Sequence, residues 1–206
     1  MDQTLAAGLK LGKSRVELIP ESYLLPLDPA AIFGRTGLLE VDLGCGDGSF
    51  LRALATERPG INFLGIERLL RRVRSSERKA RELSNVQIIR AETMFILRHL
   101  LPVESVHVFY LLFPDPWPKR RHHRRRLVTK EFLDATWNCL TSHGSLFLAT
   151  DHDDYFAAIC RLVKQTSRFA VANSDWNLPA TSFEQKFAAA GAGIQRLELR
   201  KVSPVT

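Results

Sequence analysis

The sequence predicts an α/β fold, a doubly wound and mostly parallel sheet with helices on both faces. Short apolar runs alternate with segments of helical spacing along most of the chain. A glycine-rich turn follows the first of these runs, at the point where the first helix is expected to begin. Alternating strands and helices are typical of a parallel sheet that is covered on both faces.

The expected strands and helices follow one another in a regular order. The first apolar run is 38–43, Ser49–Glu57 has the spacing of an amphipathic helix, and 61–66 is the second run. Further strands are expected at 86–89, Val106–Leu112 and 145–149, with helices at 68–83, 93–101, 131–140 and 155–164. In the last quarter, Phe169–Ala172 and 194–202 are expected to be strands, and 183–190 a short helix.

The chain has the size and composition of a single globular domain. It has 206 residues, of which 45% are hydrophobic and 25% charged. Pro20, Pro26 and Pro29 break any long helix near the start, so residues 1–37 are expected to form an N-terminal arm before one domain at 38–206.

Membrane association and secretion are not expected. No stretch approaches the roughly 20 apolar residues that cross a bilayer, and the first residues lack an apolar run followed by a cleavage pattern. Cys45, Cys139 and Cys160 lie far apart and include no CxxC pair, so we expect reduced thiols and a cytoplasmic protein.

The glycine-rich turn reads DLGCGDG at residues 42–48. In an open α/β sheet, ligands bind beyond the carboxyl ends of the strands, and glycines there let the backbone come close to them. Glu67 ends the second apolar run, roughly 20 residues after the last glycine. A carboxylate at that position can accept two hydrogen bonds from the ribose hydroxyls of an adenosine, so the turn predicts a nucleoside cofactor.

Two cofactor classes fit this layout, NAD and S-adenosylmethionine. A pyrophosphate-binding turn usually reads GxGxxG, but Ser49 stands where the third glycine is expected, because Gly48 comes one residue early. A carboxylate at Asp42 would repel a pyrophosphate and attract the amino group of S-adenosylmethionine. The sequence therefore favours S-adenosylmethionine, with S-adenosylhomocysteine as product, over NAD. A tight turn without a ligand would leave Glu67 unexplained. Glu92 fits either the adenine edge or a helix-opening acid that complements the helix dipole.

The loop after the fourth expected strand reads FPDPWP at residues 113–118. Proline fixes its own φ and pushes the preceding residue towards extended backbone, so Asp115 is held in a stiff loop. The loop follows a strand expected beside the first, which is where a substrate would meet the reactive methyl group. A proline-rich turn with a solvated aspartate is the alternative.

Basic residues dominate the segment that follows. Lys and Arg fill six of the eight positions 119–126, and the whole chain has a formal charge of +7. We expect a phosphate-binding surface for a nucleic acid, although such a run is often only a solvated face. A second basic group follows Glu67 and extends this surface: Arg68, Arg71, Arg72, Arg74, Arg78, Lys79 and Arg81.

His122 and His123 lie inside the basic run. Adjacent side chains in a cationic loop rarely chelate, and no carboxylate or thiol stands at a helpful spacing, so we expect no metal site. Trp117 fits either a stack on a nucleic-acid base or a buried anchor of the loop.

Together these motifs resemble the bacterial type of tRNA (guanine-N7-)-methyltransferase. The sequence FPDPWPKRRHHRRR at 113–126 is highly specific to that family, and the agreement runs from about Phe33 to Leu197. DLGCGDG at 42–48 and GIE at 65–67 match its cofactor motifs, and ATD at 149–151 and TSFE at 181–184 match its substrate motifs. The resemblance implies a Rossmann-like, seven-stranded class I S-adenosylmethionine-dependent methyltransferase fold. It also implies methyl transfer to N7 of a guanine in the variable loop of tRNA.

The turn and the resemblance together imply roles for single residues. Asp115 is the expected catalytic residue. The methyl-donor pocket is expected to be lined by Asp42, Gly44, Gly46, Gly48, Glu67, Glu92 and Asp115. The tRNA or its target base is expected to contact Lys119, Asp151, Thr181, Ser182, Phe183 and Glu184. The tRNA phosphates are expected to contact Arg120, Arg121, Arg124, Arg125 and Arg126.

The chain departs little from the family pattern. The family often has Glu where Asp42 stands and Asp where Glu92 stands, which keeps the charge and changes the reach. Ser182 replaces a commonly longer polar residue. The segment before Phe33 matches weakly, so whether the arm is mobile or contacts tRNA stays open, as does the choice between monomer and homodimer.

Thr181 and Glu184 also have the spacing of a capping box, in which each side chain satisfies a backbone N–H at the start of a helix. Gly191 would then end that helix. With the resemblance, we favour a helix start that faces the substrate and serves both purposes.

Guanine N7 carries a lone pair and no proton, so its attack on a sulfonium methyl group needs no general base. Asp115 is therefore expected to position the base and to favour the positive charge that passes to the purine. One rival is methylation of an exocyclic amine, whose Asp-Pro-Pro-aromatic loop has a second proline that is absent here. The second rival is an RNA-binding protein without activity, and the third is an NAD oxidoreductase.

Overall fold

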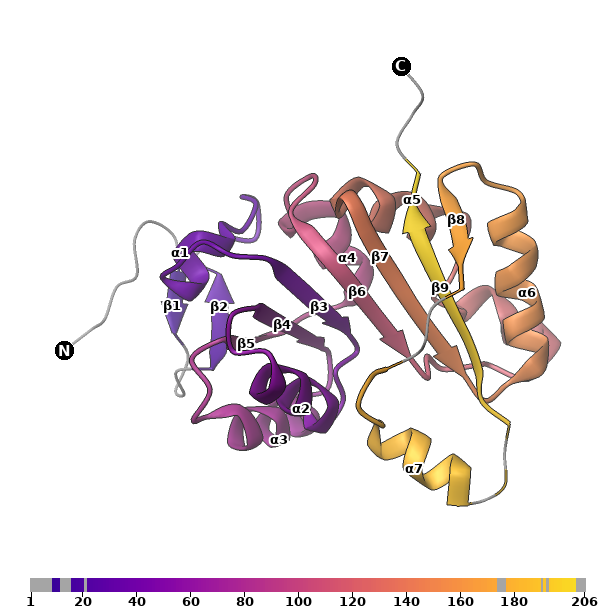
Figure 1. The fold of residues 1–206 in the computed structure, drawn as a ribbon, viewed down its shortest axis with the longest axis horizontal. Helices are drawn as coiled ribbons and strands as arrows, with labels where there is room; N and C mark the ends of the chain where they lie inside the picture. The colour runs from indigo at the N-terminus through magenta and orange to yellow at the C-terminus, as the bar shows by residue number, and fades with distance from the viewer. Residues whose placement is uncertain are drawn as a thin grey trace.

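The computed structural model describes residues 9–11, 16–20, 22–173, 177–189, 191 and 193–202. In these residues one nine-stranded sheet has the order β1-β2-β5-β4-β3-β6-β7-β9-β8 (Figure 1). The strands are β1 (Leu9–Leu11), β2 (Glu17–Pro20), β3 (Leu39–Leu43), β4 (Asn62–Glu67), β5 (Val86–Arg90), β6 (Val106–Leu112), β7 (Leu140–Thr150), β8 (Phe169–Ala172) and β9 (Gln195–Lys201). Neighbours from β2 to β7 pair in parallel, whereas β9 is antiparallel to β7 and β8.

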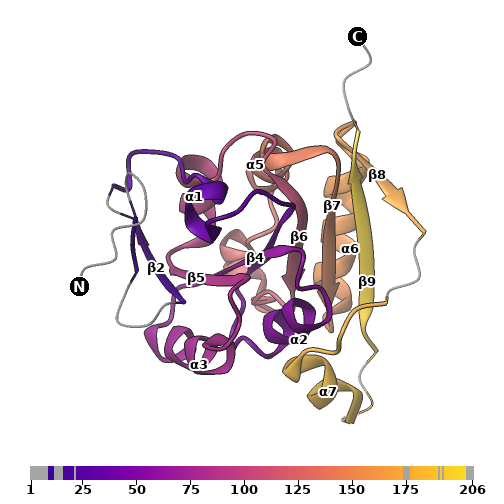
Figure 2. The ribbon, with the colours of Figure 1, turned by 60° about the vertical axis from the view of Figure 1, so that its left-hand side comes forward.

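Helices cover both faces of this sheet (Figure 2). They are α1 (Pro29–Phe33), α2 (Ser49–Glu57), α3 (Leu70–Ala80), α4 (Thr93–Phe95), the π-helix η1 (Ile96–Leu100), the 3₁₀-helix η2 (Arg120–Arg125), α5 (Lys130–Cys139), α6 (Asp153–Lys164) and α7 (Ser182–Ala189). One core cluster joins the sheet to α1, η1, α5 and α6, and the other joins it to α2 and α3. Successive strand residues alternate between the clusters: Phe63 belongs to one and Leu64 to the other.

The predicted doubly wound, mostly parallel sheet is confirmed, with its seven strands from β3 to β9. The structure adds two strands at the edge beside β5, since β2 pairs in parallel with β5 and β1 pairs antiparallel with β2. Val16, Leu18, Leu27 and Ile32 are buried. Their apolar side chains complete the core at this edge, which corrects the expected arm at 1–37 for these residues. Residues 1–8, 12–15 and 21 lie outside the described part.

Several helix starts have a side-chain cap. Thr129 Oγ1 accepts a hydrogen bond from the Phe132 amide at 3.2 Å at the start of α5, and Glu92 caps α4 in the same way. The helix expected at 93–101 is instead one α-turn followed by a π-helix, which closes with a 2.9 Å bond from the Leu101 amide to the Ile96 carbonyl. Within the described ranges, no helix combines the length and apolar character that crossing a membrane requires.

Candidate active site and cofactor pocket

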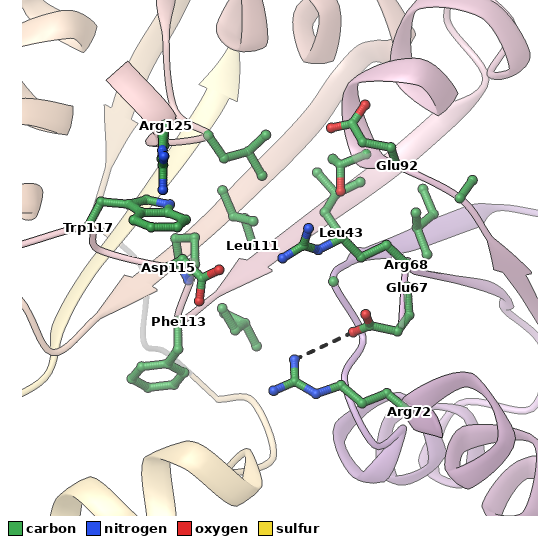
Figure 3. A pocket seen from close by; sticks show the side chains of 17 residues that line it. Leu43, Glu67, Arg68, Arg72, Glu92, Leu111, Phe113, Asp115, Trp117 and Arg125 are labelled. Carbon is green, nitrogen blue, oxygen red and sulfur yellow. Dashed lines mark ion pairs between the residues drawn. The ribbon is translucent and has the colours of Figure 1, made fainter. Parts of the chain in front are cut away.

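Two neighbouring cavities open beyond the carboxyl ends of β3, β4 and β6. The smaller, of about 280 Å³, extends between Glu67, Glu92 and Trp117 (Figure 3). The larger, of about 640 Å³, extends from Asp42 and the glycine turn to α7. The two cavities share six lining residues: Gly44, Arg72, Leu112, Phe113, Pro114 and Asp115. The structure thus brings the glycine turn and the proline-framed loop to one site, as parallel strands predict.

The glycine turn has left-handed backbone at Gly44, Gly46 and Gly48, with φ of 87°, 59° and 76°. A Cβ at Gly44 would meet nothing within 4 Å, because this residue faces both cavities. A Cβ at Gly48 would lie 2.7 Å from Cα and Cβ of Ser76 on α3. One glycine leaves room for a ligand, and the other leaves room for a helix.

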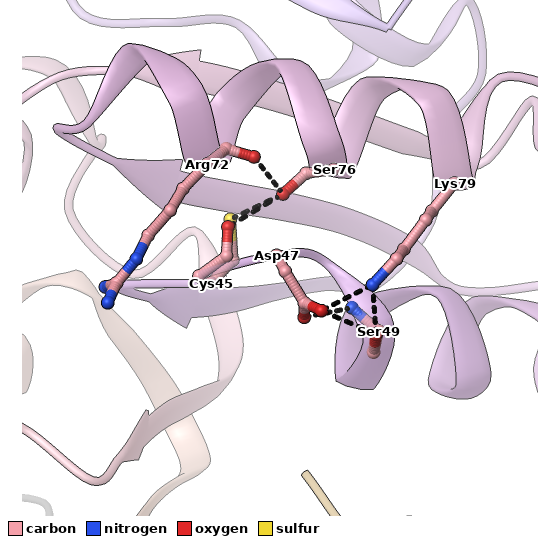
Figure 4. Close-up of polar contacts among 7 residues, drawn as sticks. Cys45, Asp47, Ser49, Arg72, Ser76 and Lys79 are labelled. Carbon is pink, nitrogen blue, oxygen red and sulfur yellow. Dashed lines mark hydrogen bonds and ion pairs between the residues drawn. The ribbon is translucent and has the colours of Figure 1, made fainter. Parts of the chain in front are cut away.

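Helix α3 holds the turn through Ser76, which was not predicted, and through Lys79, which was expected on the nucleic-acid surface (Figure 4). Ser76 Oγ donates to the Gly46 carbonyl at 2.9 Å. Lys79 Nζ donates to Asp47 Oδ2 and to Ser49 Oγ, each at 2.5 Å. These contacts fix the backbone that lines the larger cavity.

Asp42 is the most perturbed acid of the site. It is the last residue but one of β3, is 4% exposed, and lines the larger cavity. Burial, and then the negative charge of Glu67, raise the pKa of Asp42 to about 8. A carboxyl group with this pKa is mostly protonated at neutral pH, and a bound cation would favour its ionised form.

Glu67 ends β4 and is 4% exposed. Its Oε1 accepts a hydrogen bond from the Leu69 amide at 2.8 Å, and its Oε2 lies 3.8 Å from Nη1 of Arg72. Figure 3 shows Arg72 and Arg68 extending towards the Asp115 loop across the smaller cavity. One carboxylate oxygen is thus oriented by backbone, and the other lies in a long ion pair with a half-exposed arginine.

Glu92 has one of the two roles that its position suggests. Its Oε2 accepts a 2.8 Å hydrogen bond from the Phe95 amide, so it is the N-cap of α4. The residue is exposed and lines the smaller cavity, so the cap and a ligand contact are compatible.

Asp115 is exposed and lines both cavities. Its loop is strained as well as proline-rich, because Phe113 and Trp117 have φ of 55° and 45°, which non-glycine residues rarely adopt. Two hydrogen bonds hold it: the Phe113 amide donates to the Ala149 carbonyl, and Arg126 Nε donates to the Pro116 carbonyl, each at 2.8 Å. The carboxylate therefore has a fixed support, as expected.

The arginine run divides into exposed and buried members. Lys119, Arg120, Arg121, Arg124 and Arg125 are exposed. The Arg125 guanidinium lies 4.8 Å from the centre of the Trp117 ring, and both residues line the smaller cavity.

Arg126 corrects the expectation of a phosphate contact. It is 7% exposed, donates to Asp154 at 2.6 Å, and lies over the Tyr155 ring. Because its guanidinium supports the Asp115 loop from inside, it is not presented to a ligand.

Only some of the expected substrate residues line the larger cavity. Asp151, Thr181 and Phe183 line the larger cavity, whereas Lys119 and Glu184 do not. The side chain of Ser182 lies outside what the structure describes. The capping box is confirmed: the Glu184 amide donates to Thr181 Oγ1 at 2.9 Å, and the Thr181 amide donates to Glu184 at 3.4 Å. Glu184 also pairs with Arg196.

An aromatic cluster forms one wall of the larger cavity and was not predicted. The ring of Phe113 lies 6.4 Å from that of Phe183 and 5.4 Å from that of Phe187. All three residues line the cavity. Aromatic faces of this kind can stack on nucleic-acid bases.

The chain is similar to known methyltransferases over most of its length. A family model described as "Putative methyltransferase" matches residues 37–197. The tRNA (guanine-N(7)-)-methyltransferase of Syntrophotalea carbinolica is 32% identical over 92% of this chain and 85% of the relative. The enzyme of the same name from Bordetella pertussis is 32% identical over 93% and 76%.

Solved structures agree on the fold. The antibiotic-resistance methyltransferase Kmr superposes with a TM-score of 0.63 at 19% identity, covering 96% of this chain and all of that one. A geranyl diphosphate C-methyltransferase from Streptomyces coelicolor, solved with S-adenosyl-L-homocysteine, has a TM-score of 0.54 at 15% identity, covering 87% and 73%. The fold is that of class I methyltransferases. By its similarity to the curated relatives, the chain belongs to the tRNA (guanine-N(7)-)-methyltransferase family.

Proposed function

We propose that this protein transfers a methyl group from S-adenosylmethionine to N7 of a guanine in the variable loop of tRNA, giving 7-methylguanosine and S-adenosylhomocysteine. The observation that carries this proposal is the place of Asp115, whose stiff loop lines both the cavity beside Glu67 and the cavity beside α7. A cofactor and a base that occupy the two cavities meet at this loop. Because tRNA is the substrate, we place the reaction in the cytoplasm.

The residues of the pocket fit S-adenosylmethionine. Buried Asp42, whose ionised form needs a cation, suits the amino group of the methionine part. Glu67 suits the ribose hydroxyls, because the ion pair of one of its oxygens with Arg72 is long, at 3.8 Å, and leaves that oxygen able to accept a hydrogen bond. Gly44 leaves the space that a cofactor backbone needs. In the described residues no group of three or more His, Cys, Asp or Glu side chains could hold a metal.

Bound S-adenosylmethionine supplies an electrophilic methyl group, and this chain supplies placement and charge. Asp115 and Asp151 accept hydrogen bonds from N1 and N2 of the guanine and so aim N7 at the methyl carbon. Their negative charges favour the positive charge that develops on the purine. No proton leaves N7, so Asp115 is not needed as a general base and acts by position.

The experiment is methyl transfer to unmodified tRNA with labelled S-adenosylmethionine, followed by nucleoside analysis and mapping of the labelled site. We expect 7-methylguanosine in the variable loop, and none in a matched tRNA whose variable-loop guanine is replaced by adenine. A label on an exocyclic amine would favour the rival amine methyltransferase. Binding of tRNA without transfer would favour an RNA-binding protein without activity.

A further inference from the structure

The basic residues on and beside α3 differ in what they contact: some pair with acidic side chains, and others line the larger cavity. Arg72 and Lys79 lie on the flank that meets the glycine turn, where they pair with Glu67 and Asp47. Arg81 pairs with Glu82 at 2.9 Å just after the helix. Two arginines of α3, Arg71 and Arg78, are exposed and line the larger cavity.

The spacing explains this division. Val73, Ser76 and Ala80 are buried, so they mark the inner face of α3. Arg71, Ser75 and Arg78 recur at i, i+4 and i+7 and form one stripe on another side of the helix. All three members of the stripe line the larger cavity.

Arg71 and Arg78 stand on a helix that is rich in basic residues and carries one acid, Glu77. Arg74 stands between them, and like charges three or four residues apart destabilise a helix. In the ranges that the structure describes, the ion pairs of basic residues on α3 involve Arg72 and Lys79, and none involves Arg71 or Arg78. Both arginines would attract an anionic ligand in the cavity.

The rest of the cavity indicates which part of a polyanion this rim accepts. Lys186 of α7 is exposed, lines the same cavity and lies 5.8 Å from the centre of the Phe183 ring. The carboxylates of Asp115 and Asp151 also line the cavity, and they repel phosphate and attract the N–H edge of a base. Phosphates are therefore held at the rim while a base enters.

We propose that Arg71, Arg78 and Lys186, here called the α3–α7 rim, form a second phosphate-binding surface for tRNA. It is separate from the arginine run on η2, whose Arg125 lines the smaller cavity. The two surfaces bind the backbone on different sides of the target nucleotide. This inference rests on the proposed function, because it takes tRNA as the ligand.

The test is the salt dependence of tRNA binding in the full chain carrying Arg71→Gln and Arg78→Gln. The slope of log Kd against log salt should fall by about 1.4 to 1.8, since each lost contact contributes roughly 0.7 to 0.9. The Kd at low salt should rise between about twofold and thirtyfold for two exposed contacts. The Kd for S-adenosylhomocysteine should stay within about twofold, because Ser76 and Lys79 still hold the turn.

The matched control carries Arg74→Gln and Arg81→Gln, which removes the same charge from the same region at positions that do not line the cavity. Equal loss of slope in the control would overturn the proposal in favour of a general field effect. An unchanged slope in the Arg71→Gln, Arg78→Gln variant, with an unchanged melting temperature, would also overturn it. If the rim proposal fails in this way but the wild-type protein still methylates tRNA, the proposed function is unaffected. If the wild-type protein binds tRNA through the α3–α7 rim but forms no 7-methylguanosine, the proposed function is wrong and the proposal for the rim still holds.

Discussion

Asp42 is expected to release a proton when the cofactor binds. Its carboxyl group is buried beside Glu67, and these two causes raise its pKa to about 8. A bound ligand brings an ammonium group to the pocket and favours the ionised carboxylate. Cofactor binding and deprotonation of Asp42 are therefore linked.

The size of the effect follows from the pKa. At pH 7 a group with a pKa of about 8 is about 90% protonated, so binding should release about 0.9 proton. Ionising the carboxyl group at this pH takes about 1.4 kcal/mol, which weakens binding roughly tenfold relative to a site that is already ionised. The amino group of the ligand is itself mostly protonated at pH 7 and changes the count little.

Isothermal titration calorimetry with S-adenosylhomocysteine at pH 7, in buffers of low and high ionisation enthalpy, measures this proton directly. Asp42→Asn keeps the shape of the side chain and should reduce the release to near zero while weakening binding. A wild-type release below about 0.3 proton, or the same release from Asp42→Asn, would refute the reasoning.

Four further substitutions separate catalysis, folding and RNA binding. Asp115→Asn should lower kcat by at least about a hundredfold and leave the Kd for tRNA within about threefold, since the residue acts by placement and charge. Single-turnover rates and binding titrations measure the two effects, and a near-normal rate would contradict this role. Gly48→Ala should destabilise the fold by about 1 to 3 kcal/mol in urea unfolding, because its Cβ would lie 2.7 Å from α3 and its φ is 76°. A native-like midpoint would contradict the packing. Arg126→Ala should lower the free energy of unfolding by about 1 to 3 kcal/mol, discounted because its partner Asp154 is 56% exposed. Arg124→Ala should instead leave stability unchanged and reduce the salt slope for tRNA by about 0.7 to 0.9, so exchanged phenotypes would reverse these assignments.

Local patterns determined much of the fold. The bounds of α2, β6 and β8 are those expected from periodicity, because each of these segments has clear apolar spacing and clear flanking signals. The first two strands were missed, since β2 joins the sheet by pairing with β5, far along the chain. Pairing between distant segments produces no pattern that can be recognised in a strand of four residues.

The same distinction holds for the site. Asp42, Glu67 and Asp115 could be predicted to converge, because each lies at or just beyond the carboxyl end of a parallel strand and those ends share one edge of the sheet. Composition could also predict an anion-binding surface at the basic run, and this stays a prediction.

Only the tertiary structure decided which basic side chains are available. Arg126 and Arg124 look alike in the sequence, yet one is buried against Tyr155 and the other is exposed. Lys79 is committed to the glycine turn, whereas Arg78, its neighbour, faces the cavity. The wall formed by Phe113 and Phe187 joins residues far apart in the chain. The sequence determines which side chains are charged or aromatic, and the packing of distant elements determines which of them a ligand can reach.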